Sequence, residues 1–478
     1  MKLQKMIIGL AALTCGSVLT AQSIHIGGYV DYTSTLATQV AHNYPDAGEW
    51  DASEVAAEFG PVQNGIHFLN LDATAPNVDF HTNVWIGSGL GPWYADAPEY
   101  VDRTKYDGSG TYFSKTGDDV ATPIGQMWVC THFFDDQLRF YTGNFASNGW
   151  SAGYILPGYV LGGQKIDSLA MRGDASDSAF SGIEILPSFF SGFKAIVGFP
   201  IAPFTNSYSK FNDWSHLAKS VKLMAQYKWL LYNVTFTGGV RPNTYFTNGA
   251  GYSDNFTKSY LGEAFLQVDM PSLFYGILMN ASYDIRWRKV EESGANLVSG
   301  EDWSKTATAH ILQFSTKLTS LVEGWEFAFE DRFAYYAPHY IRINETAIYN
   351  VLGMSATHPI PGTSFVFGFN TQFMYGQDAM GYGNGVDKDA VKYHDALCTD
   401  LLGYNANFMG DLDGEKAHAP KHGSPGRYFS IYGFPYIQKN FANGNAKIGI
   451  ELQYKHLETS NVLQAFAWRI PVGLVFWW

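Results

Sequence analysis

Charged side chains that could act on a dissolved solute recur in this chain between large apolar residues. Glu326 and Glu330, for example, lie among Trp325, Phe327 and Phe329. Successive side chains of a β-strand point to opposite faces, so this spacing places the charges on one face and the aromatic rings on the other. The candidates on such polar faces are Arg139, Arg241, Arg286, Arg332, Arg469, Glu326, Glu330 and Glu451.

These candidates carry both signs, and two interpretations of them stay open. Opposite charges that face each other across a water-filled interior produce a transverse field, which orders water and polar solutes. Alternatively, the charges neutralise one another as ion pairs, and their role is only to give each buried charged group a partner. The first interpretation makes them pore-lining residues, and the second makes them structural.

Other reactive residues do not assemble into a site of known chemistry. The segment Asp411 to Glu415 alternates carboxylates as a calcium loop does, but it is truncated relative to a full ligand set. Ser147-Asn148-Gly149 resembles part of the serine segment of outer-membrane phospholipases, yet Phe145 stands where their activating His is needed. The three cysteines form no CxxC pair. We therefore predict no cofactor, no metal site and no enzymatic activity.

The composition excludes several classes of protein. The chain of 478 residues is 46% hydrophobic and 16% aromatic, too apolar to stay disordered. Beyond residue 21 it contains no apolar run of the ~18 residues that a spanning helix needs, which excludes a helical membrane protein. A net charge of −13 argues against nucleic acid as a partner. A large soluble β-protein and a transmembrane β-barrel remain.

Strict alternation of apolar and polar residues supports the β class along the whole chain. It is clearest over residues 275–287, 365–375 and 448–454, where one face of each segment is apolar and the other polar. In a soluble sandwich the apolar faces would pack together. In a membrane barrel they would meet lipid, and the polar faces would line a lumen.

The connections between these segments favour the barrel, because short and long links alternate without exception. The short links lie at 75–77, 135–136, 187–192, 228–230, 271–274, 319–324, 358–362 and 442–445. The long ones lie near 34–63, 89–124, 147–178, 202–218, 242–258, 288–305, 337–344, 376–426 and 457–462. We therefore predict an all-β, single antiparallel transmembrane barrel of about 18 strands, with short periplasmic turns and long external loops. Sixteen strands would result if the poorly alternating segments 179–187 and 345–357 were not strands.

The two ends of the chain predict export to an outer membrane. Lys2 and Lys5 precede a short apolar run that ends before Ala21, which indicates a signal peptide over residues 1–21 and a barrel over 22–478. The last strand has one apolar face, formed by Ile470, Val472, Leu474, Phe476 and Trp478.

This last strand resembles the C-terminal signature of bacterial outer-membrane β-barrels, in which a terminal aromatic residue ends an alternating strand. The resemblance implies that the barrel assembly machinery reads these five residues. It also implies passage through the periplasm and a location in the cell outer membrane.

The third long loop differs from the others, because residues 153–163 are apolar and rich in glycine. An exposed loop of this composition is costly, so we expect it to fold into the barrel. General porins use their third external loop as a constriction, and by that resemblance the constriction candidates are Asp167, Arg172, Asp174 and Asp177. A cap packed on the barrel rim is the alternative.

The resemblance to the porin-like superfamily implies passive diffusion of small hydrophilic solutes or ions. Expected partners are outer-membrane lipid, such solutes, and a second copy of the chain in a homo-oligomer. One alternative is a non-channel surface protein, such as an adhesin, that acts through its long acidic loops. A polymer export channel is another, although an anionic polymer would need a more basic lumen than this sequence provides.

Overall fold

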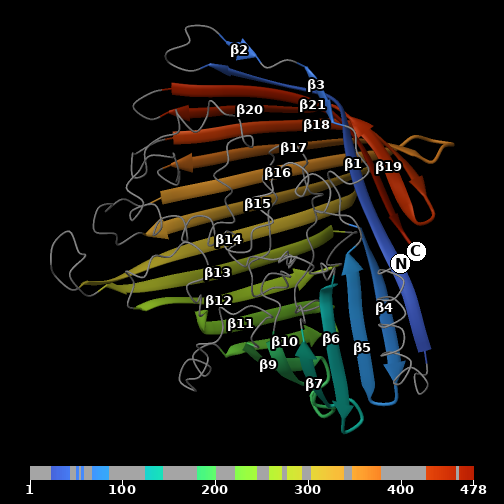
Figure 1. The fold of residues 1–478 in the computed structure, drawn as a ribbon, viewed down its shortest axis with the longest axis vertical. Coiled ribbons are helices and arrows are strands. Elements are labelled where there is room, and N and C mark those ends of the chain that lie inside the picture. Colours follow the sequence, from blue (N-terminus) through green and yellow to red (C-terminus); the bar gives the residue numbers. More distant parts are fainter. Residues whose placement is uncertain are drawn as a thin grey trace, which may run out of the picture.

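The computed structural model describes residues 23–43, 50–52, 55–58, 67–85, 124–143, 180–200, 221–244, 258–271, 277–292, 303–337, 347–377, 427–458 and 462–478, and every regular element in them is a β-strand (Figure 1). No helix in these ranges is long and apolar enough to cross a membrane. In chain order the strands are β1 (Ser23–Asn43), β2 (Asp51–Ala52), β3 (Ala56–Glu58), β4 (His67–Ala75), β5 (Val78–Trp85), β6 (Ile124–Phe133), β7 (Leu138–Gly143), β8 (Phe180–Ile185), β9 (Phe193–Pro200), β10 (Lys222–Trp229), β11 (Val234–Thr244), β12 (Lys258–Met270), β13 (Ile277–Glu292), β14 (Trp303–Val322), β15 (Trp325–Ala337), β16 (Ala347–Pro359), β17 (Phe365–Gln377), β18 (Arg427–Phe441), β19 (Gly444–Gly449), β20 (Glu451–Glu458) and β21 (Val462–Trp477).

The strands form one closed antiparallel barrel of 18 strands. β2 and β3 are short segments that pair with β1. β19 and β20 are two parts of one strand, because both pair with β18 and with β21 and they meet at Ile450. The prediction of 18 strands is confirmed, and the two doubtful segments form β8 and β16.

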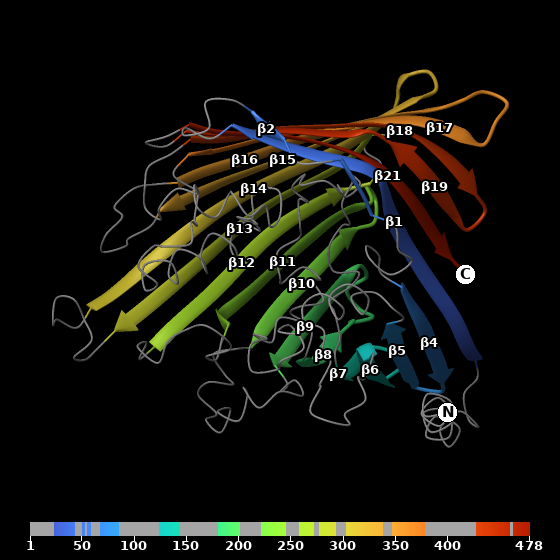
Figure 2. The same cartoon turned by 45° about the horizontal axis from the view of Figure 1, so that its top comes forward.

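Pairing of the first strand with the last closes the barrel (Figure 2). β1 lies between β4 and β21, and its register with β21 runs from Tyr29↔Trp477 to Asn43↔Gln464. This long pairing corrects one expectation, since residues 34–43 belong to β1 and not to a loop. The cause is a register shift between Thr35 and Ala37, which interrupts the alternation in the sequence while the pairing continues.

Most of the described short turns lie within the links that the sequence predicts. The link expected at 319–324 is shorter, because β14 continues to Val322 and the turn is Glu323 and Gly324. Residues 272–274 of another expected link lie outside the described residues. The link expected at 228–230 is a turn over residues 230–233, which ends on Asn233 at a φ of 52°. Asparagine tolerates this left-handed backbone better than most residues, so the turn is displaced toward it.

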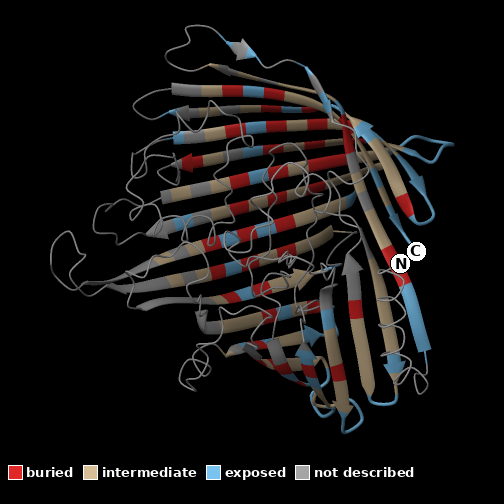
Figure 3. Cartoon of the chain, viewed as in Figure 1, coloured by how far each residue is buried: buried red, intermediate tan, exposed pale blue. Residues whose placement is uncertain are grey.

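Buried and exposed side chains alternate along the strands (Figure 3). On β15 the side chains of Ala328, Glu330 and Arg332 are buried, whereas Tyr335, of opposite parity, is exposed. The exposed face of the barrel is apolar; among its most exposed side chains are Ile26, Leu266, Leu312, Leu352 and Ile431. The polar side chains accordingly gather on the inner face.

The C-terminal residue completes the closure. The backbone N–H of Gly28 donates to the carbonyl oxygen of Trp478 over 3.0 Å, and the N–H of Trp478 donates to the carbonyl of Gly28 over 3.2 Å. The Trp478 indole lies over Gly28, where a Cβ atom would overlap its ring, and it stacks on Phe476 at 5.8 Å between centroids. Gly28 is therefore required for the terminal ring to pack on the first strand.

We predict that Gly28→Ala destabilises the barrel by about 1–3 kcal/mol, because the new methyl group displaces the Trp478 ring. The midpoint of urea unfolding in detergent measures this loss. Gly433→Ala on β18 is the matched control, since a Cβ there meets nothing within 4 Å. Equal midpoints for the two variants would show that the ring does not depend on Gly28.

Candidate pore wall and its polar network

The inner face of the barrel carries many polar side chains, which form a wall between its apolar clusters. Buried members on the inward parity include Thr237, Gln267, Ser282, Asp284, Gln313, Ser315, Ser355, Asn370, Gln372, Ser430 and Gln453. They lie in register on neighbouring strands; for example, Ser355 pairs with Asn370. Such a wall can hydrogen-bond to water and to polar solutes.

The predicted wall charges divide into two groups by burial. Glu330, Arg332 and Glu451 are 2%, 1% and 0% exposed, and the Tyr432 hydroxyl donates to Glu451 over 2.5 Å. Arg139 and Glu326 keep partial exposure, and Lys317 on β14 pairs with Glu326 over 2.5 Å. A solute can therefore touch Arg139 and Glu326 directly. The three buried side chains can act on it only through their electric field.

The remaining predicted wall charges are placed by register. Arg469, which is partly exposed, pairs with Glu451 across β20 and β21. Arg241 on β11 and Arg286 on β13 both pair in register with Glu263 on β12. The side chains of Arg241 and Arg286 lie outside what the structure describes. Their roles in selectivity stay predictions.

Two other predicted groups have different outcomes. The constriction candidates Asp167, Arg172, Asp174 and Asp177 lie outside the described residues. The five C-terminal residues predicted as an assembly signal lie on or directly after β21, which pairs with β1, β19 and β20. Recognition of this strand by assembly machinery stays a prediction.

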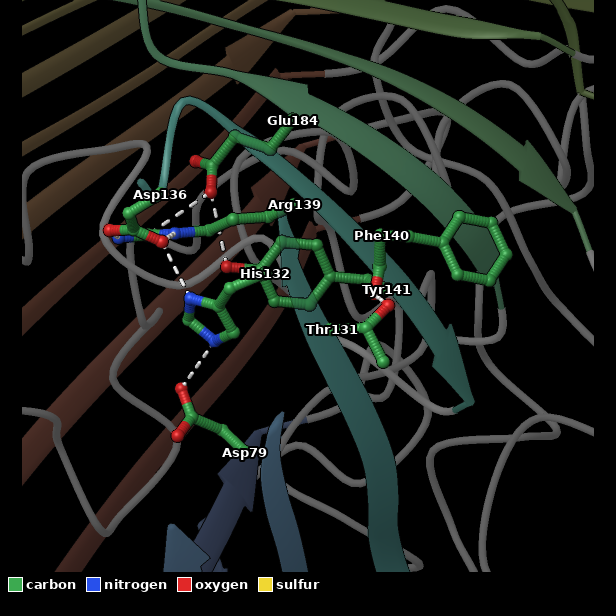
Figure 4. A network of polar contacts seen from close by, with 8 residues as sticks. All are labelled: Asp79, Thr131, His132, Asp136, Arg139, Phe140, Tyr141 and Glu184. Carbon is green, nitrogen blue, oxygen red and sulfur yellow. Dashed lines mark hydrogen bonds and ion pairs between the residues drawn. The ribbon is translucent and has the colours of Figure 1, made fainter. Parts of the chain in front are cut away.

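A network of polar contacts joins β5 to β8 at the short-turn end of the wall (Figure 4). His132 on β6 is at its centre. Its Nε2 lies 2.8 Å from Asp79 Oδ2 on β5, and its Nδ1 lies 2.5 Å from Asp136 Oδ1 in the turn after β6. The imidazole thus bridges two carboxylates from different elements.

The network continues through Arg139 to β8. The Arg139 guanidinium donates from Nε to Asp136 Oδ1 over 2.7 Å, and it also donates from Nη2 to Asp136 Oδ2. Its Nη1 donates to Glu184 Oε2 over 3.3 Å, and the Tyr141 hydroxyl donates to the same oxygen over 3.1 Å. Acidic side chains alternate with His132 and Arg139 along this chain of contacts, which joins the four strands β5, β6, β7 and β8.

The turn that carries Asp136 has an unusual backbone. Phe134, Asp135 and Asp136 have φ angles of 56°, 52° and 70°, the left-handed region that costs a residue other than glycine about 1–2 kcal/mol. The hydrogen bonds from Arg139 hold the pKa of the Asp136 carboxyl down at about 2, against an ordinary value of 3.8, and His132 adds to this. The bidentate contact with Arg139 thus stabilises a strained turn.

Of this network, the sequence predicted Arg139 alone. Asp79, His132, Asp136 and Glu184 were missed, although the tight turn at 135–136 contains a usable signal. A hairpin around that turn places His132 opposite Arg139, the register that the structure has. Among the described residues, no group of three or more His, Cys, Asp or Glu side chains is placed to hold a metal ion.

Comparisons with known proteins find likeness in structure alone. No protein-family model and no curated protein matches the sequence. Solved structures that resemble it include OprB of Pseudomonas putida, with 13% identity, a TM-score of 0.41, and coverage of 97% of this chain and 96% of that chain. OpdQ of Pseudomonas aeruginosa has 10% identity, a TM-score of 0.39, and coverage of 95% and 99%. OmpT of Vibrio cholerae has 10% identity, a TM-score of 0.37, and coverage of 96% and 100%.

The class of the protein follows from its own geometry. A closed antiparallel barrel leaves no strand edge without a partner, which is the condition for a β-structure to cross a lipid bilayer. Its exposed apolar face and polar inner face are those of an outer-membrane barrel. At the short-turn end, Phe134, Phe189 and Leu231 are among the most exposed side chains, as expected for residues at a membrane interface. The chain is a closed antiparallel β-barrel of the outer-membrane type.

We predict that Asp136→Asn lowers the free energy of unfolding at pH 7 by about 0.2–1 kcal/mol, the range for solvent-exposed ion pairs. Because the folded pKa of Asp136 lies below its ordinary value, its contribution is complete above about pH 4 and disappears as the pH falls through 2. Urea midpoints of the wild type and the variant should therefore differ at pH 7 and converge near pH 2.

Asp135→Asn is the matched control in the same turn, since Asp135 makes no ion pair among the described residues and shares the left-handed backbone. Asparagine tolerates that conformation, so neither variant changes the turn itself. A difference for Asp136→Asn that is equal at both pH values would contradict the assigned role of the carboxylate.

Proposed function

We propose that the protein is a channel for passive diffusion of small hydrophilic solutes or ions, and not an enzyme. The observation that carries this proposal is the closed barrel of 18 strands with a polar inner wall. Barrels of 16–18 strands are wide enough to enclose an aqueous channel.

The proposed ion preference follows from which wall charges reach solvent. The side chains of Asp72, Asp79, Asp136 and Glu326 are 35–46% exposed, whereas those of Arg139 and Lys317 are 26% and 30% exposed. All six lie near the short turns. Among these six side chains the carboxylates are the more accessible, and Lys228 on β10 is an exposed cation near another short turn. A mouth in which one sign of charge predominates concentrates the opposite ion.

We predict steady single-channel steps from the refolded mature protein in a planar bilayer, with a reversal potential in a KCl gradient that favours cations. Asp72→Asn combined with Glu326→Gln should shift this potential toward anions. Lys439→Gln is the control, because Lys439 lies over the Phe365 ring on the outer face and not on the wall. Absence of conductance from folded protein would favour the adhesin alternative, and an anion preference in the wild type would contradict the ion assignment.

A constriction by residues 147–178 is part of the proposal. It is supported by an apolar patch on the inner face, beside the two strands that this segment connects. The patch consists of Cys130, Tyr141, Ile196, Met224 and Phe265, all at most 8% exposed, with Trp128 packed against them. An apolar, glycine-rich segment has the chemistry to cover such a patch.

We predict that deletion of residues 150–165 raises single-channel conductance, because it removes the apolar part of the proposed constriction. The control is replacement of the same residues by a Gly/Ser linker of equal length, which keeps the loop but not its apolar contacts. Conductance unchanged by both variants would favour the alternative of a cap on the barrel rim.

A further inference from the structure

The contacts of His132 determine how many protons its ring carries. Its Nε2 lies 2.8 Å from Asp79 Oδ2, and its Nδ1 lies 2.5 Å from Asp136 Oδ1 (Figure 4). An ionised carboxylate only accepts hydrogen bonds, and a neutral imidazole has one donor nitrogen and one acceptor nitrogen. A neutral ring would therefore turn a lone pair toward one of the two carboxylates. Hydrogen bonds on both sides require one proton more than a neutral ring and two carboxylates hold.

The additional proton belongs to the ring and not to a carboxyl group. Imidazole binds a proton more strongly than a carboxylate does. The contacts from Arg139 and His132 hold the pKa of the Asp136 carboxyl down at about 2, so this group is ionised at neutral pH. The Asp79 side chain is 35% exposed, so water still solvates its charge.

The other charges near the ring form a pattern that agrees with this assignment. Arg139 pairs with His132 in the register of β6 and β7, but its guanidinium donates to Asp136 and Glu184. Each basic side chain of the network thus lies between two carboxylates. With a doubly protonated ring, the three carboxylates face two positive charges, whereas with a neutral ring they face one.

We propose that His132 is doubly protonated and is a specificity-determining residue of the channel mouth, where its positive charge limits the preference for cations. This inference rests on the proposed channel function. The His132 side chain is 19% exposed and lies between two carboxylates that are 35% and 46% exposed, so its charge offsets theirs where a solute passes. Loss of one ring proton removes this charge and leaves a lone pair facing a carboxylate. The mouth then becomes more negative and concentrates cations more strongly.

The first test is the nitrogen NMR spectrum of the histidine side chains in the complete protein, in lipid nanodiscs at pH 7. The two ring nitrogens have nearly equal shifts in an imidazolium and widely different shifts in a neutral ring. Signals that are absent from His132→Gln belong to His132, and we expect those of an imidazolium.

Two variants of the carboxylates make this test specific. Asp79→Asn should give a neutral ring with its proton on Nδ1, because the new amide can donate to Nε2. Asp136→Asn should give the opposite tautomer, with the proton on Nε2. Asp135→Asn is the matched control and should keep the imidazolium, since Asp135 makes no ion pair among the described residues. A neutral ring in the folded wild type, or the same ring state in both variants, would overturn the proposal.

The second test is the reversal potential in a KCl gradient at pH 6 and pH 9. The wild type should become more selective for cations as the pH rises, and His132→Gln should lose most of this shift. His81, whose Nδ1 lies 2.7 Å from Asp72 Oδ1, stays in the variant and accounts for a residual shift.

His358→Gln is the control for the second test, because His358 pairs with Phe367 on the outer face and its Nδ1 lies 2.8 Å from the Gly324 carbonyl oxygen. This variant should keep the shift of the wild type. A shift in His132→Gln equal to that of the wild type would overturn the proposal. If the folded protein does not conduct, the channel proposal fails, and the NMR spectra still decide the charge of His132.

Discussion

The fold depends on one constraint, the need to give every backbone polar group a partner where there is no water. Within a bilayer this condition forbids a free strand edge, so the first and last strands of the sheet must pair. The register from Tyr29↔Trp477 to Asn43↔Gln464 meets it, and the hydrogen bonds between Gly28 and Trp478 extend it to the last residue. The glycine at position 28 and the terminal tryptophan are consequences of closure rather than independent features.

Closure separates each strand into two chemical faces, and exceptions to that separation show where another contact is needed. On the inner face two apolar clusters interrupt the polar wall, one that includes Met224 and Phe265 and one formed by Tyr432, Phe434 and Tyr436. On the outer face the carboxylate of Asp331 interrupts the apolar surface, and the Asn350 amide donates to it.

The same periodicity explains what the sequence could predict. Side chains of period two, together with the sorting of connections by length, predict the strands, their number and the inward position of Glu326, Glu330 and Arg332. The alternation of side chains along a strand could not predict the network around His132, because this network depends on the register between strands and on a turn with left-handed backbone. The full length of β1 was missed for a related reason, since a register shift at Thr35 ends the alternation before the strand itself ends.

Wall charges have different tasks according to their distance from the short turns. Glu330, Arg332 and Glu451 lie well inside their strands and are buried, so their charges are fixed parts of the wall. Asp79, Asp136 and Arg139 lie at or beside a turn, where they keep solvent contact and also hold a strained backbone in place. A solute that enters by this mouth therefore meets charges whose positions are set by the turns. Because Asp136 and Arg139 hold each other, a change to either alters both the field at the mouth and the shape of the turn.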